Sequence, residues 1–196
     1  MPLNEIQQVN ICIHSWCVAC SIAGASLAQT IIGDELSISI MVICMVSQIC
    51  HIVKAKATKA LIGLILGSNG GIYILGRIGV SFVKMVPIIG NCINAAVAAT
   101  SCEVLGWFTY AILKKGRDPL THSKSELRRL SIDARKFRKD METERKKLKL
   151  LRDCMSFDDR TEIEVYERIM CDSNSTQDDR ILASQCIATL YEKYVN

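Results

Sequence analysis

The residues with the clearest chemical potential lie near the start of the chain, in the stretch HSWCVAC. His14, Cys17 and Cys20 are spaced so that all three would share one face of a helix. A Cys-x-x-Cys pair that follows Trp is typical of a thioredoxin-type redox site, and His with two Cys is part of a zinc ligand set. A third interpretation is that two small thiols simply pack inside an apolar helix.

The sequence around this pair favours packing. The short segment before His14 has no strand–helix–strand pattern, and the sequence after Cys20 stays apolar and helix-like. A zinc site would also need a fourth ligand, from Cys44, Cys50 or His51 in the next segment. We therefore expect buried, inert thiols and no cofactor, with metal or redox chemistry at the HSWCVAC motif as an alternative.

No other catalytic arrangement is visible. The three histidines, at positions 14, 51 and 122, form no Ser-His-acid pattern. The closest approach to a P-loop, GIYILGRI at 71–78, has Arg-Ile where a P-loop needs Lys and then Ser or Thr. A loop that resembles the start of an EF-hand at Asp172 lacks the required Gly and the terminal Glu. The sequence predicts a protein that is not an enzyme.

Charge divides the chain into two parts. Only 11 of the 44 charged residues precede residue 117. A helix stop, Gly116-Arg-Asp-Pro119, follows the apolar part. The sequence thus predicts a hydrophobic module at 1–116 and a charged domain at 117–196. Within the latter, 124–152 reads as a basic helix with a net charge of +7, and 157–195 as acidic helices.

The apolar part consists of segments long enough to span a bilayer. Charge-poor runs cover 9–33, 36–53, 60–76 and 85–113, which predicts about four helices in an all-α fold. Buried helices of a soluble bundle meet the same length criterion. Small residues favour close packing of helices in a membrane, and the predicted packing positions are Gly63, Gly67, Gly71, Pro87 and Gly90.

The connections between these segments are sorted by charge. Asp34 and Glu35 lie between the first two segments, whereas Lys54, Lys56 and Lys59 lie between the second and third. An even number of crossings would place the Lys-rich connections and the charged C-terminal half in the cytosol. Glu103 is the one charge inside the fourth segment, where it must be paired, protonated or hydrated; we expect Arg77 or Lys84 as its partner.

The charged part carries clear helix signals. Three Ser-x-x-acid patterns, at Ser123, Ser156 and Ser175, resemble capping boxes. An apolar stripe from Leu127 to Met155 keeps 3-4 spacing and is broken only at Glu144. This stripe predicts a three-helix bundle that folds back on itself or, alternatively, an intermolecular coiled coil.

One stretch resembles a known family. Residues 76–116 contain Val86-Pro87-Ile88-Ile89-Gly90, then Asn94 with an alanine-rich run to Ala99, then Leu105-Gly106. This pattern resembles the domain of unknown function 697 family, whose members are helical, often membrane-associated modules. The resemblance implies an accessory role at a membrane, with a GTPase as a possible partner, and brings no catalytic residues.

These observations lead to one functional expectation and two alternatives. We expect a non-enzymatic, membrane-associated helical protein that anchors or remodels membrane and contacts a protein partner or itself. The net charge of +4 is too small to indicate nucleic acid. The alternatives are a soluble helical assembly protein and the metal- or redox-linked protein described above. The predicted lipid or partner contacts are Lys54, Lys56, Lys59, Arg128, Arg129, Arg135 and Lys136.

Overall fold

The computed structural model describes residues 3–26, 33–66, 90–116 and 123–195, and in these ranges it confirms the all-α prediction. The helices that precede residue 117 are α1 (Glu5–Ser26), α2 (Gly33–Ile52), α3 (Lys59–Leu66) and α5 (Gly90–Lys115). The helices that follow it are α6 (Lys124–Asp140), α7 (Glu142–Cys154), α8 (Phe157–Cys171) and α9 (Gln177–Val195).

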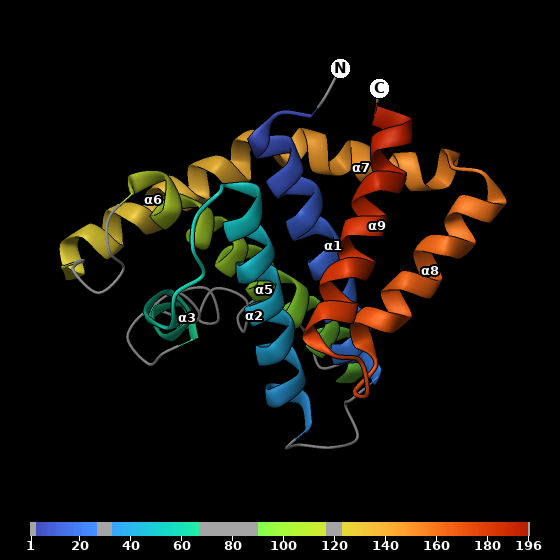
Figure 1. Cartoon of the computed structure of the whole chain (residues 1–196), viewed down its shortest axis with the longest axis horizontal. Helices are drawn as coiled ribbons and strands as arrows, with labels where there is room; N and C mark the ends of the chain where they lie inside the picture. Colours follow the sequence, from blue (N-terminus) through green and yellow to red (C-terminus); the bar gives the residue numbers. More distant parts are fainter. Residues whose placement is uncertain (1–2, 27–32, 67–89, 117–122, 196) are drawn as a thin grey trace.

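Helix α1 lies at the centre of the molecule. It packs against α5 and α2 from the apolar part and against α7, α8 and α9 from the charged part. In Figure 1, α6 and α7 run along the upper edge, where α1 begins and α9 ends. The largest fully buried side chains include Trp16 of α1, Trp107 of α5 and Tyr191 of α9. The core is therefore built around α1 by helices from both ends of the chain.

Both compositional parts contribute to this one core. Its buried side chains run from Leu3 through Ile112 in the first part and from Leu130 through Tyr191 in the second. The boundary at 116/117 stays a prediction about how the chain is organised. In space the two parts are not separate, because α5 packs against α6, and α1 and α2 pack against α9.

The apolar stripe of the basic segment faces this core. Leu130, Ala134, Met141, Leu148 and Met155 are all buried. The segment is not one continuous helix as expected, since it divides at Met141, whose φ of −92° and ψ of 2° are not helical. The break lets α6 follow α5 while α7 crosses to α1 and α9. The stripe is thus covered by other helices of the same chain, among them α5 of the apolar part, and the three-helix bundle stays a prediction.

Helices approach each other closely at a glycine that we did not predict as a packing position. A Cβ added to Gly106 of α5 would lie 2.7 Å from Ile13 Cγ1 of α1 and 3.2 Å from Met45 Sδ of α2. Gly63 is exposed, and among the described residues a Cβ added there would meet nothing within 4 Å, so no packing contact of this glycine is observed. Gly90 begins α5, and its surroundings, like Gly67, Gly71 and Pro87, lie outside the described residues.

Candidate functional site

The outer face of α6 is basic. Four of the predicted contact residues, Arg128, Arg129, Arg135 and Lys136, are exposed on this helix, and Lys139 joins them. Their helical positions fall within about a third of the circumference, directly opposite the buried stripe. The geometry thus brings five cations onto one surface, which we call the α6 basic face.

An exposed isoleucine lies at the centre of the α6 basic face. Ile132 is 59% exposed and lies one turn from both Arg128 and Arg135. None of the five cations has an ion-pair partner within the part of the chain that the structure describes. The nearby acid Asp133 forms an ion pair with Lys115 instead, with its Oδ2 3.6 Å from Lys115 Nζ. The α6 basic face thus combines one exposed hydrophobic side chain with five cations that have no ion-pair partner among the described residues.

The other predicted lysines lie on a different segment. Lys54 and Lys56 are exposed in the connection between α2 and α3, and Lys59 is the exposed first residue of α3. Lys54 adopts a φ of +57°, which ends α2 in the left-handed region. These three lysines therefore form a second, smaller basic segment that does not share a helix face with α6.

Glu103 joins the two parts of the chain. Its side chain is 8% exposed in the middle of α5, and its Oε1 lies 3.1 Å from Arg138 Nε and also contacts Arg145 Nη1. The expected partners, Arg77 and Lys84, lie outside the described residues. The partners observed belong to α6 and α7, so the buried carboxylate is neutralised by the very helices that the sequence placed in a separate domain.

Within the described ranges, two helices are long and apolar enough to cross a membrane by length and composition: 5–25 and 95–115. About two thirds of each window is buried inside the protein, at 67% and 61%. Their buried faces contact other helices, and α1 also carries buried polar groups, such as Trp16, whose Nε1 donates to Gln48 Oε1 at 2.8 Å. In this fold both helices serve as core helices.

The thiols of the HSWCVAC motif lie in a sulfur-rich part of the core. Cys20 contacts Met41 Sδ at 3.8 Å, and Cys102 of α5 contacts Met45 Sδ at 3.5 Å. Hydrogen bonding with Cys17 and Cys20, together with burial, raises the pKa of Cys102 well above its usual range. The raised pKa keeps the Cys102 thiol protonated near neutral pH.

His14 does not join the thiols as a ligand. It is 5% exposed, and its ring meets Tyr191 of α9 edge to face, with centroids 5.9 Å apart. Burial, and then the charges of Lys149, Arg145 and Arg152, lower the pKa of His14 to about 4. Among the described residues no three His, Cys, Asp or Glu side chains are grouped to hold a metal.

Two further buried charges were missed in the sequence. Glu167 of α8 is 5% exposed and accepts both hydrogen bonds of a bidentate pair from Arg152, at 2.6 and 2.9 Å. Arg180 of α9 is 3% exposed, yet only its Nη2 is bonded, to the Asp172 carbonyl at 2.6 Å. Its Nε and Nη1 have no partner. Neither charge breaks an apolar run, so nothing in the sequence marks them as buried.

Comparison of the chain with protein-family models, with curated proteins and with solved structures finds no match. The resemblance of residues 76–116 to the domain of unknown function 697 family stays a prediction. The candidate site is therefore defined by the geometry of this chain alone, and that geometry points to the α6 basic face.

Proposed function

We propose that the protein is a non-enzymatic helical protein that binds the anionic surface of a membrane through the α6 basic face. The observation that carries this proposal is the group of five unpaired cations around Ile132. A Lys or Arg near an anionic leaflet contributes about 1 kcal/mol of binding free energy, and an exposed apolar side chain can enter the headgroup region.

Attachment is peripheral in this proposal. Helices α1 and α5 stay in the protein core, because inserting them would separate Glu103 from Arg138 and Arg145. The cytosolic leaflet carries the anionic lipids that such a face requires, so we propose that the charged half lies in the cytosol. The soluble assembly protein is the alternative, and the burial of both apolar helices favours it equally.

Vesicle co-sedimentation tests the proposal. We expect the wild-type chain to pellet with vesicles of phosphatidylserine and phosphatidylcholine and to stay in solution with phosphatidylcholine alone. The double variant Arg128→Gln/Arg135→Gln should bind the anionic vesicles about 10- to 30-fold more weakly, from about 1 kcal/mol per lost cation.

A matched control removes the same charge elsewhere. Arg160 and Arg168 are exposed on the acidic helix α8. The double variant Arg160→Gln/Arg168→Gln should bind anionic vesicles as the wild type does. Equal losses in both double variants would mean that net charge, and not the α6 basic face, drives binding. Absence of wild-type binding would leave the soluble assembly protein as the function.

A further inference from the structure

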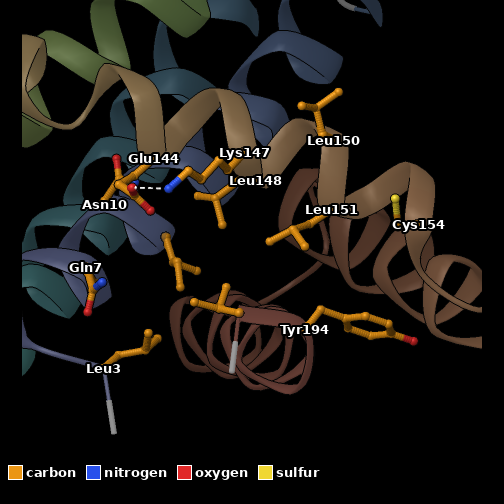
Figure 2. Close-up of a pocket in the computed structure, with 12 residues that line it drawn as sticks. Leu3, Gln7, Asn10, Glu144, Lys147, Leu148, Leu150, Leu151, Cys154 and Tyr194 are labelled. Atoms are coloured by element: carbon orange, nitrogen blue, oxygen red, sulfur yellow. Dashed lines mark hydrogen bonds and ion pairs between the residues drawn. The ribbon is translucent and has the colours of Figure 1, made fainter. Parts of the chain in front are cut away.

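A groove of about 320 Å³ lies away from the α6 basic face, where the start of the chain and the end of α9 meet α7 (Figure 2). Its walls are mostly apolar: Leu3 and Ile11 on one side, Leu148 and Leu151 of α7 on another, and Val195 of α9. Small-molecule sites in proteins have volumes of about 300–1,000 Å³, apolar walls and a few placed polar groups. The groove meets this description.

One end of the groove is polar. Asn10 lines it and is only 4% exposed, yet its side-chain amide has no hydrogen bond within the described part of the chain. Lys147 lies at the same end and donates to Glu144 Oε1 at 2.7 Å. Figure 2 shows these three side chains gathered at one end, with Tyr194 and Cys154 toward the other. An unpaired amide that faces the groove is available to hydrogen-bond a ligand there.

The groove has one polar end and otherwise apolar walls, which suits a ligand with a polar head and a single hydrocarbon tail. Asn10 and Lys147 supply donors at one end, and the path from there follows Leu148 and Leu151. Lys149 adds exposed positive charge on the same helix, so the surface beside the polar end attracts an anion despite Glu144. An anionic head with a single hydrocarbon tail matches both ends.

We propose that this groove binds a long-chain fatty acid, with its carboxylate at Asn10 and Lys147 and its acyl chain along α7 toward Tyr194. This function goes beyond the membrane binding proposed above and does not depend on it. The groove uses α1, α7 and α9, whereas the membrane-binding surface is the outer face of α6. Either proposal can fail while the other stands.

Titration calorimetry of the full chain with palmitate, below its micelle-forming concentration, tests the proposal. We expect one saturable site. Cetyl alcohol has the same chain without the carboxylate and should bind at least about tenfold more weakly, since it loses the charge-assisted hydrogen bonds. No binding of palmitate, equal binding of the alcohol, or uptake at many sites would each overturn the proposal.

Variants separate a ligand-binding role of Asn10 from a structural one. Asn10→Leu keeps the volume and removes the unpaired amide, so we expect an unchanged or higher Tm together with about tenfold weaker palmitate binding. Lys147→Gln should weaken palmitate binding to a similar degree. Lys146→Gln is the control: Lys146 pairs with Glu142 at 3.0 Å and does not line the groove, so palmitate affinity should not change.

Two variants are used so that the test still gives an answer if one of them does not fold. If Asn10→Leu stays folded and binds palmitate as tightly as the wild type, the proposal is wrong. If Asn10→Leu does not fold, Lys147→Gln decides: a loss of palmitate affinity that Lys146→Gln does not share supports the site, and equal affinity in both contradicts it.

Discussion

Helices α1 and α6 differ in which of them presents a surface to the outside of the protein. The apolar helix α1 has the length and hydropathy of a membrane span, yet it is surrounded by other helices of the same chain. The basic helix α6 is the element that presents an unpaired surface to the outside. Helix α6 can do so because its other face supplies Leu130 and Ala134 to the core.

The difference between the two helices lies in where their polar groups find partners. Two buried polar groups of α1 and α5 have partners inside the protein: Trp16 donates to Gln48, and Glu103 is ion-paired with Arg138 and Arg145. The outer cations of α6 find none in the described part of the chain. The mean hydropathy of a helix does not show whether its polar groups have partners inside the protein. The partners of the individual polar groups do show this.

The largest effect is expected where the apolar and charged helices are joined. The double variant Arg138→Met/Arg145→Met leaves Glu103 buried without its cations, so we expect the free energy of unfolding to fall by about 3–5 kcal/mol. Urea unfolding followed by circular dichroism measures this. Adding Glu103→Met to the double variant should restore most of the loss. An unchanged unfolding free energy in the double variant would show that the ion pairs do not join the two parts.

Acid should destabilise the packing of α7 and α9 on α1. An unfolded histidine titrates near 6.5, and burial lowers the pKa of His14 to about 4. The unfolded chain therefore takes up this proton first as the pH falls. The contribution of His14 to stability is complete above about pH 6.5 and is lost toward pH 4. We expect about 2 kcal/mol of this loss near pH 5.

The variant His14→Phe isolates that contribution, because it keeps a ring against Tyr191 and cannot titrate. Urea unfolding at neutral pH and near pH 5 should show a smaller drop for the variant than for the wild type. Parallel drops in the two proteins would mean that His14 is not buried beneath α9.

Close packing of α1 on α5 should be sensitive to a single methyl group. Gly106→Ala places a Cβ against Ile13 of α1, and we expect the unfolding free energy to fall by about 2 kcal/mol. Gly63→Ala is the matched control in open space on α3, where the better helix propensity should raise stability by about 0.5 kcal/mol. Equal tolerance of both substitutions, seen in thermal unfolding, would argue against the close contact.

At Arg180 we expect a small effect on the free energy of unfolding, and it is a gain in stability, not a loss. Two of its nitrogen atoms, Nε and Nη1, are buried without a partner among the described residues, so Arg180→Met should raise the unfolding free energy by about 1 kcal/mol. Exposed Arg168→Met serves as the comparison and should leave it unchanged. A clear loss of stability in Arg180→Met would mean that the guanidinium has partners that its single carbonyl contact does not represent.

Local signals in the sequence predicted the helix starts well. Ser123 forms the expected capping box with Glu126, and Ser156 caps α8 by accepting from Asp159 N at 3.1 Å. The third start is displaced by one residue, because α9 is capped by Thr176, which accepts from Asp179 N at 3.1 Å. The sequence SNSTQDD contains both spacings, so the capping pattern alone does not distinguish them.

Long-range pairing was the part that the sequence did not reveal. The apolar stripe of α6 and α7 indicated which side is buried, but nothing in its spacing identifies α5 and α1 as the surface it covers. Likewise, Glu103 was recognisable as a charge that needs a partner, while its partners lie 35 and 42 positions further along the chain. Neutralisation between distant helices depends on the tertiary fold, which spacing along one segment does not encode.

Release of vesicle-bound protein by salt tests the central claim most directly. The account predicts that protein bound to phosphatidylserine vesicles dissociates in about 1 M salt, where the Debye length falls to about 3 Å and the cations of α6 are screened. Protein that remains in the pellet after this salt and after alkaline carbonate would contradict it, because α1 and α5 would then lie in the bilayer and not in the protein core.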